Sequence, residues 1–211
     1  MKAMIFAAGR GERMRPLTDT CPKPLLPVRG RPLIVWHINN LVRAGITEIV
    51  INHAHLGQMI EDALGDGSQF GARIAYSSEG TALETAGGIA KARHLLGEAP
   101  FVAIAGDIFC PHFDFAKVSD VLEENDVWGN PLPADRRDLA WLYLVKNPPH
   151  HPEGDFALES FAITNHGEPR LTFSGIGVYR PELFDAVPPG SSAKLAPILR
   201  EFAEQRRIGG E

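Results

Sequence analysis

Four short segments of this 211-residue sequence combine glycine or proline with charged side chains. The first, residues 7–16 (AAGRGERMRP), holds three arginines within six positions. Glycines let the backbone approach a ligand closely, and the free N–H groups of such a loop attract anions. The segment lacks the Gly-Lys-Ser/Thr ending of a Walker A loop, and Met14 stands where a dinucleotide fingerprint has its third glycine. A polyphosphate site is therefore one interpretation, and a glycine turn with solvated arginines is the other.

The second segment, residues 21–28 (CPKPLLPV), places Lys23 between two prolines. Proline fixes its own φ and restricts the residue before it, so we expect extended backbone that aims the lysine charge. A rigid surface loop is the alternative.

The third segment, residues 83–88 (LETAGG), clusters glycines between a predicted strand and a predicted helix, where ligands of open α/β sheets collect. A tight turn capped by Glu84 or Thr85 would explain this segment as well.

The fourth segment is Gly106-Asp107, directly after the apolar run 100–105 (PFVAIA). A carboxylate beside a polyphosphate normally acts through Mg²⁺, although an aspartate at a strand end is also common as a turn or cap residue. The glycines in 173–177 (FSGIG) indicate either close backbone approach to a ligand or a bulge in a strand. The histidine pairs 53/55 and 150/151 lack the spacing of a zinc site.

Alternating apolar runs and amphipathic segments must position these groups. Short spacing between strands and helices predicts right-handed crossovers, and hence an α/β fold with a mainly parallel sheet and helices on both faces. The predicted strands are 2–8, 47–52, 72–76 and 100–105, and the predicted helices are 32–45, 56–64 and 84–96.

The second half of the sequence has a different pattern. Two strands with no helix between them favour an antiparallel extension of the sheet. Residues 127–137 (VWGNPLPADRR) resemble a surface insertion, and we find no linker that would divide the chain. The predicted strands here are 139–145, 156–163 and 170–179, and the predicted helices are 114–124, 181–186 and 193–207.

Composition excludes several classes of protein. The 21 basic and 26 acidic residues give a net charge of −5, which argues against a general nucleic-acid binder and against a polybasic membrane-surface protein. Two cysteines, Cys21 and Cys110, cannot form a disulfide framework, and they favour a reduced compartment. The first apolar stretch, residues 3–8, is too short for a signal peptide or a membrane span. We therefore expect a cytoplasmic protein that binds neither nucleic acid nor membrane.

In their order and spacing, the motifs AAGRGERMRPLT, PKPLLPV, LETAGG and GD resemble those of the sugar-1-phosphate nucleotidylyltransferases, over residues 1 to about 110. The middle of the chain is similar to the N-acetylmuramate α-1-phosphate uridylyltransferases of peptidoglycan recycling in bacteria. The segments that carry this second resemblance are 51–54 (INHA), 64–68 (LGDGS) and 147–158 (NPPHHPEGDFAL). Hexose-1-phosphate thymidylyl- and guanylyltransferases are close in the first half but lack the last segment.

The resemblance implies a Rossmann-like (GT-A-like) fold and a role for individual residues. Arg13 and Lys23 would be the catalytic cations, and Asp107 would hold Mg²⁺, the implied cofactor. The nucleotide would be bound by Gly9, Gly11, Glu12, Arg13, Lys23, Glu79, Thr85, Gly87 and Ala105. The sugar would be bound by Asn147, Asp155 and Gly175.

The implied reaction transfers UMP from UTP to a sugar 1-phosphate and releases pyrophosphate. A phosphate monoester dianion is already a nucleophile, so positioning and charge neutralisation suffice, and no general base is needed. The implied partners are UTP and the sugar 1-phosphate, bound by a monomer or a weak homo-oligomer.

The sequence departs from the family pattern at two places. Ala105 stands where the subfamily usually has an asparagine, so only backbone contact with the nucleotide could remain there. A C-terminal segment like Trp-x-Asp-x-Gly-Thr, which carries a second metal-binding aspartate in the family, does not appear before Glu211. We therefore expect one nucleotidyltransferase domain over 1–211, with weakened metal binding and reduced turnover. The alternatives are a mannose- or glucose-1-phosphate nucleotidylyltransferase and a nucleotide-sugar-binding domain with impaired catalysis.

Overall fold

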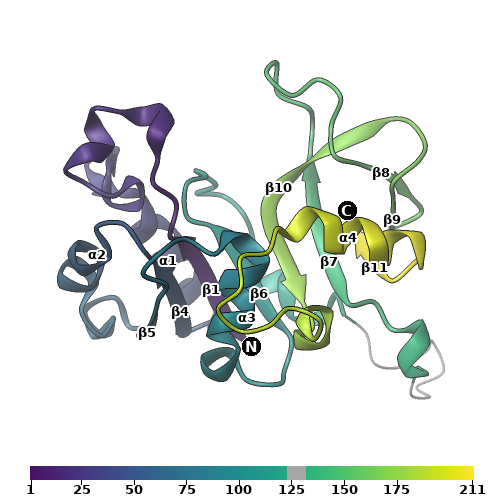
Figure 1. Ribbon diagram of the computed structural model, residues 1–211, viewed down its shortest axis with the longest axis horizontal. Helices are drawn as coiled ribbons and strands as arrows, with labels where there is room; N and C mark the ends of the chain where they lie inside the picture. Colours follow the sequence, from purple (N-terminus) through teal and green to yellow (C-terminus); the bar gives the residue numbers. More distant parts are fainter. Residues whose placement is uncertain (123–131) are drawn as a thin grey trace.

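A nine-stranded mixed sheet runs through the molecule (Figure 1). The structure is a computed structural model, and it describes residues 1–122 and 132–211. In sheet order, the strands are β5 (Arg73–Ser78), β4 (Glu48–His53), β1 (Lys2–Ala7), β6 (Phe101–Ala105), β10 (Arg170–Tyr179), β7 (Ala140–Val145), β11 (Ile208–Gly210), β9 (Ala162–Thr164) and β8 (Phe156–Glu159).

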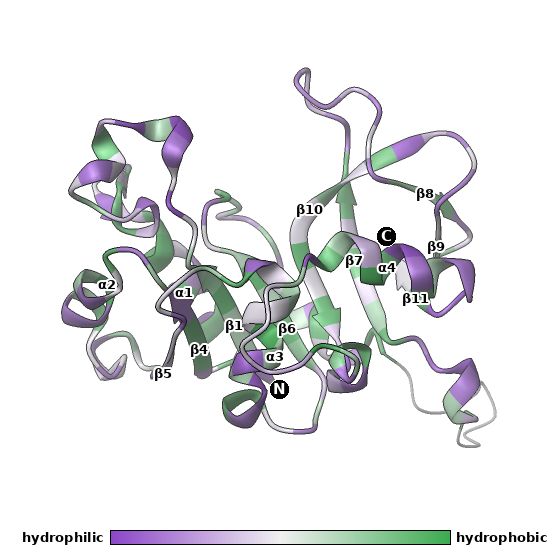
Figure 2. Cartoon of the chain, in the orientation of Figure 1, coloured by the Kyte–Doolittle hydropathy of each residue, from purple (hydrophilic) through white to green (hydrophobic). Residues whose placement is uncertain are grey.

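The first four strands of this order are parallel, as the sequence predicts. Their side chains alternate between two faces, and both faces are apolar because helices cover both. Ala3 and Ile5 of β1 belong to one buried cluster, whereas Met4 between them belongs to the other. Figure 2 shows the resulting hydrophobic interior of the sheet and the hydrophilic outer loops.

Two helices cover each face of the sheet. Helices α1 (Leu33–Arg43) and α2 (Gly57–Leu64) contribute to the cluster around Ile5. Helices α3 (Glu84–Leu96) and α4 (Leu195–Glu204) contribute to the cluster around Met4. None of the helices in the described part of the chain combines the length and apolar character that crossing a bilayer requires.

The long strand β10 joins the parallel half to the antiparallel half. Its end pairs antiparallel with β6 on one side and with β7 on the other, Thr172 and Phe173 also pair with β7, and its beginning pairs with β8. The register shifts between Phe173 and Gly177, so the glycine-containing stretch does form a bulge. The predicted antiparallel extension is therefore present, and it attaches to the last parallel strand.

Several elements differ from the sequence prediction. The predicted strand 156–163 is a hairpin, β8 and β9, whose two turn residues Ser160 and Phe161 have φ of 48° and 70°. Hairpin turns of this kind usually carry Asn or Gly, so the sequence lacked the turn signal. The short strands β2 (Pro27–Val28), β3 (Arg31–Pro32) and β11 were not predicted, because two or three residues show no periodicity.

Three predicted helical segments are shorter or tighter than expected. Residues 114–124 contain only a 3₁₀ helix at Phe115–Asp120, and residues 123–124 lie outside the described part of the chain. Residues 181–186 likewise form a 3₁₀ helix, Pro181–Phe184, while 193–207 contains the α-helix α4. Of the predicted insertion 127–137, residues 127–131 also lie outside the described part of the chain.

Candidate active site

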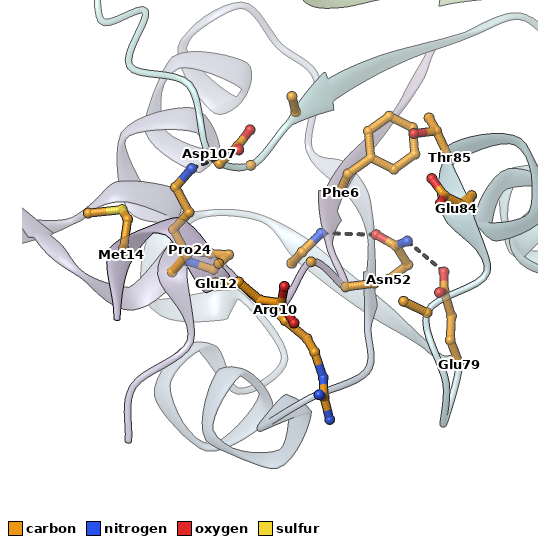
Figure 3. A pocket seen from close by; sticks show the side chains of 18 of the residues that line it. Phe6, Arg10, Glu12, Met14, Pro24, Asn52, Glu79, Glu84, Thr85 and Asp107 are labelled. Atoms are coloured by element: carbon orange, nitrogen blue, oxygen red, sulfur yellow. Dashed lines mark hydrogen bonds and ion pairs between the residues drawn. The ribbon is translucent and has the colours of Figure 1, made fainter. Parts of the chain in front are cut away.

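A cavity of about 570 Å³ opens at the carboxyl ends of β1, β4, β5 and β6 (Figure 3). Ligands of open α/β sheets bind at this edge because the strand ends and the following loops converge there. Figure 3 shows Asp107 and Met14 on one side of the cavity, and Thr85 and Glu79 on the other. The predicted site residues that line it are Gly9, Gly11, Glu12, Arg13, Lys23, Glu79, Thr85, Ala105 and Asp107.

The loop after β1 turns sharply at Gly11. Its φ of +66° lies in the left-handed region, and a Cβ there would approach Thr18 Cγ2 to 2.9 Å. The Thr18 hydroxyl donates to the Gly11 carbonyl at 2.9 Å, and a 3₁₀ turn, Glu12–Met14, follows. Hydrogen bonds within the loop itself therefore fix its conformation at the mouth of the cavity.

Two arginines of this loop, Arg10 and Arg13, line the cavity, and neither has an ion-pair partner within the described part of the chain. Arg15 differs from them. It forms an ion pair with Asp19 at 3.2 Å and does not line the cavity. The positive charge that lines the cavity therefore comes from Arg10, Arg13 and Lys23.

Lys23 reaches the cavity from a conformation that the sequence did not predict. It begins a 3₁₀ turn, Lys23–Leu25, instead of lying in extended backbone. Proline is tolerated in the first turn of a helix because its missing N–H would be unpaired there anyway, and this accommodates Pro24. The Lys23 Nζ donates to Asp107 Oδ2 at 2.8 Å, across 84 positions of sequence.

Gly106 brings Asp107 to the same edge. The Gly106 N–H donates to the Phe6 carbonyl at 2.9 Å, and a Cβ at this position would lie 2.3 Å from that oxygen. Only glycine fits so close to the end of β1. The Asp107 side chain is 46% exposed and the Lys23 side chain 21%, so the pair remains within reach of a ligand.

A buried hydrogen-bond chain forms the other wall. Asn52 Oδ1 accepts from the Ala7 N–H at 3.0 Å, and its Nδ2 donates to Glu79 Oε1 at 2.6 Å (Figure 3). The Leu83 N–H donates to the second oxygen of Glu79 at 2.8 Å. A Cβ on Gly88 would lie 2.6 Å from Glu79 Oε1, so this glycine leaves room for the pair. The chain ties the first loop of the cavity to the start of α3.

The loop that follows Asp107 is anchored on α1. His37 Nε2 lies 3.0 Å from the Ile108 carbonyl, and Cys110 Sγ lies 3.9 Å from His37 Nδ1. Burial lowers the pKa of His37 to about 4, against the opposing hydrogen bond to Ile108 and the charge of Asp107. Burial also raises the pKa of Cys110 to about 11. At neutral pH, His37 is therefore neutral and donates to Ile108, while the protonated thiol faces its other nitrogen.

The donor set can serve a divalent metal ion only in part. Among the described residues, no group of three or more His, Cys, Asp or Glu side chains is placed to hold a metal ion. Mg²⁺, however, is usually bound by one or two carboxylates together with substrate phosphates and waters. Asp107, half exposed beside the cationic loop, fits that arrangement once a phosphate is present.

Four predicted site residues lie outside this cavity. Asp155 and Gly175 line a neighbouring cavity of about 440 Å³, whereas Asn147 lines a separate one together with Pro152 and Arg170. The Asn147 amide donates to the carbonyls of Pro152 and Arg170, so its contacts are structural. Asn147 therefore does not line the cavity that Asp155 and Gly175 share.

Gly87 is the fourth of these residues, and it lies inside α3. A Cβ there would approach the Ser191 carbonyl to 2.2 Å, and its N–H donates to the Ala193 carbonyl at 3.1 Å. It packs against the segment before α4 and does not line the cavity. Backbone contact of Gly87 with a nucleotide is thus not supported by its position.

Sequence reasoning also missed residues that line the cavities. These include Phe6 and Asn52 in the first, and Lys194 and Arg200 in the second. Asn52 could have been found, because it is a polar residue near the end of the otherwise apolar run 47–52 (TEIVIN). The two cations of the second cavity carry no local signal, since nothing in the sequence shows which strand end they approach.

Comparison with known proteins gives concordant results. A family model described as nucleotidyl transferase matches residues 2–127. The N-acetylmuramate alpha-1-phosphate uridylyltransferase of Neisseria meningitidis serogroup B is 55% identical over 215 residues, which cover 100% of this chain and 89% of that protein. The UTP–glucose-1-phosphate uridylyltransferase of Synechocystis sp. is 40% identical, over 94% of this chain and 54% of that protein.

Solved structures share the fold. A putative glucose-1-phosphate thymidylyltransferase from Bacillus anthracis superposes with a TM-score of 0.79 at 23% identity, over 100% of this chain and 86% of that one. At this identity the likeness concerns the fold alone, and it agrees with the Rossmann-like arrangement of the sheet.

Proposed function

The chain belongs to the nucleotidyl transferase family, and on that premise we propose that it transfers UMP from UTP to N-acetylmuramate α-1-phosphate, a reaction of peptidoglycan recycling. The observation that carries the proposal is the cavity in which the cationic glycine loop, Lys23 and Asp107 meet at one edge of the sheet. The relative with 55% identity over the whole chain supports the choice of both substrates.

The cavity suits a nucleoside triphosphate by charge and by shape. The backbone of residues 9–14 and the free arginines Arg10 and Arg13 would bind the phosphates, since Arg offers paired N–H groups to phosphate oxygens. Residues 79–85 would bind the base and ribose on the opposite wall, where Asn52 and Glu79 hold the backbone in place.

Catalysis would consist of positioning and charge neutralisation. A phosphate oxygen of the sugar phosphate attacks the α-phosphorus of UTP in line, and the P–O bond to pyrophosphate breaks. Lys23 would exchange its contact with Asp107 for the transferred phosphoryl oxygens, whose negative charge increases in the transition state. Family members typically use a divalent metal; we propose Mg²⁺, held by Asp107 and phosphate oxygens, where it would supply further positive charge.

The proposal is tested by pyrophosphate release from UTP with N-acetylmuramate 1-phosphate. We expect Lys23→Ala to lower kcat/KM by about 10²–10³-fold, as for loss of one preorganised charge. Asp107→Asn should lower activity and raise the Mg²⁺ concentration needed for half-maximal rate. Lys117→Ala, an exposed lysine outside the cavity, is the matched control and should remain within about twofold.

Different outcomes separate the alternatives. Retained turnover in both Lys23→Ala and Asp107→Asn would refute the site. Faster reaction with glucose or mannose 1-phosphate would assign the chain to hexose-1-phosphate transfer, which the 40% identical relative represents. Binding of UTP without turnover of any sugar phosphate would indicate a binding domain. A monomer or weak homo-oligomer in the cytoplasm stays a prediction, and light scattering of the purified protein checks its oligomeric part.

A further inference from the structure

A second cavity, of about 440 Å³, adjoins the first. The two share Phe6, Glu84, Thr85 and Ala105, so a ligand in the second cavity would lie beside the transferred phosphoryl group. The geometry points to Lys194 and Arg200 as the residues that bind the carboxylate of N-acetylmuramate. This inference rests on the proposed function and names the residues that select its sugar.

Lys194 is fixed at the cavity by the start of α3. The Ala193 carbonyl accepts from the N–H groups of Ala86 at 3.0 Å and Gly87 at 3.1 Å, and the Ala193 N–H donates to the Leu83 carbonyl at 3.0 Å. The N-cap residue of α3, Leu83, has no side chain that could cap the helix, so this distant backbone oxygen satisfies two of the N–H groups at its start. Lys194, the next residue, therefore has a fixed backbone position at the rim.

The charge of Lys194 is misplaced for helix stability. It is the N-cap of α4, where Ser, Thr, Asp or Asn is preferred and where a cation opposes the helix dipole. No acidic residue in the first turn of α4 compensates it. A local rule broken at a cavity rim is typical of a residue kept for binding. An anionic ligand would compensate both the lysine and the helix end.

The acidic residues that line the cavity do not pair with Lys194 or Arg200. Asp155 has its two oxygens occupied, by His151 Nε2 at 3.1 Å and by the Phe173 N–H at 2.8 Å. The remaining acidic lining residue is Glu84, which also lines the first cavity. Within the described part of the chain, the side chains of Lys194 and Arg200 are exposed and have no hydrogen-bond or ion-pair partner.

The wall between these cations is apolar. Leu195 and Leu199 of α4 are buried and line this cavity, and so do Phe156 and Phe173. N-acetylmuramate differs from N-acetylglucosamine by a lactyl ether, which carries one methyl group and one carboxylate. An apolar wall with two free cations at its rim matches that substituent, and it matches nothing on a neutral hexosamine.

The test compares N-acetylmuramate 1-phosphate with N-acetylglucosamine 1-phosphate. We expect the ratio of their kcat/KM values to fall about tenfold in Lys194→Gln and in Arg200→Gln, and further in the double variant, as for lost charged hydrogen bonds. The KM for UTP should change little. Glu201→Gln on the same helix and Arg43→Gln on α1 are the matched controls, because both side chains are exposed and neither lines the cavity.

Calorimetric binding of the two sugar phosphates gives a second readout that needs no turnover. Preference of the wild type for the muramate, lost in the double variant, supports the inference even if transfer to this sugar is not observed and the proposed function fails. Equal binding of both sugars by the wild type would overturn the inference, and so would an equal loss for both sugars in the double variant.

Discussion

At the scale of single residues, the Asn52–Glu79 pair is the most constrained part of the cavity. Asn52 is 2% exposed and Glu79 is 8% exposed, and between them they accept the N–H groups of Ala7 and Leu83. A buried polar group that loses its partner costs about 1–3 kcal/mol. The pair therefore supports both the stability of the fold and the shape of the cavity wall where we propose that the nucleotide binds.

We expect Asn52→Ala to lower the free energy of unfolding by about 1–3 kcal/mol, because it leaves the Ala7 N–H and a Glu79 oxygen without their partner. The KM for UTP should rise more than the KM for the sugar phosphate, since the nucleotide wall is what moves. Urea denaturation and steady-state kinetics measure the two effects. Asn39→Ala, on the half-exposed face of α1, is the control; an equal effect there would contradict the assignment.

His37 predicts how stability depends on pH. It is 1% exposed, and burial lowers its pKa from 6.5 to about 4. Because the folded-state pKa is the lower one, the unfolded chain binds the extra proton first. The contribution of neutral His37 to the free energy of unfolding is therefore fully present above about pH 6.5. It is lost as the pH falls toward about 4, for a total of roughly 3 kcal/mol.

The check is urea denaturation at pH 7.5 and at pH 5.0. On acidification, the free energy of unfolding should fall by about 2 kcal/mol more in the wild type than in His37→Gln, which has no titrating group at this position. His112→Gln, at an exposed histidine, should follow the wild type. Identical pH dependence in wild type and His37→Gln would show that His37 is not the titrating group.

At the scale of elements, the contact between α3 and the segment before α4 sets the shape of both cavities. Gly87 lets the Ser191 carbonyl pass close to α3, and Ala193 then caps the helix. The glycine lowers the helix propensity of α3 by about 1 kcal/mol, so its presence in the helix interior calls for a structural reason. Close packing against another backbone supplies that reason.

Gly87→Ala tests this contact. The added Cβ would lie 2.2 Å from the Ser191 carbonyl, and a backbone atom cannot move aside as a flexible side chain can. We expect a net loss of about 1–3 kcal/mol in stability despite the better helix propensity, and a raised KM for the sugar phosphate. Thermal melting and kinetics measure both. Lys91→Ala on the same helix should show neither effect, and a stabilised Gly87→Ala protein would contradict the packing argument.

At the scale of the whole molecule, one sheet connects the parallel half of the chain to the antiparallel half. Ile104 of β6 pairs with Ile5 of β1 on one side and with Ile176 of β10 on the other, and all three are at most 2% exposed. The parallel and antiparallel strands thus share a continuous core. We propose on this basis that the chain unfolds as one domain.

A calorimetric scan tests that proposal. A single transition, with calorimetric enthalpy equal to the van't Hoff enthalpy, is the expected result. Ile104→Ala should lower the transition temperature as a whole, since loss of a buried isoleucine costs about 2–5 kcal/mol. Ile74→Ala on the edge strand β5 is the control and should cost less. Two separate transitions would show that the chain unfolds as two domains and would contradict the proposal.

The sequence by itself determined the parallel half of the sheet and most of the first cavity. Apolar runs and helical periodicity are local properties, so they located β1, β4, β5 and β6 with the helices between them. Carboxyl ends of parallel strands meet at one edge, and this predicted that the glycine loop and Asp107 lie together. The place of Lys23 beside them followed only from the family resemblance.

Only the tertiary structure decided the contacts that join distant segments. Three of these contacts depend on which surfaces pack together. The Ala193 carbonyl caps α3, Arg200 lines the second cavity, and Asn147 lines a different cavity. The hairpin at Ser160-Phe161 was hidden for a related reason, because surrounding structure holds two unfavourable φ values that local preference would reject. Long-range packing overrides local preference wherever the buried surface and hydrogen bonds gained exceed the cost of the local strain.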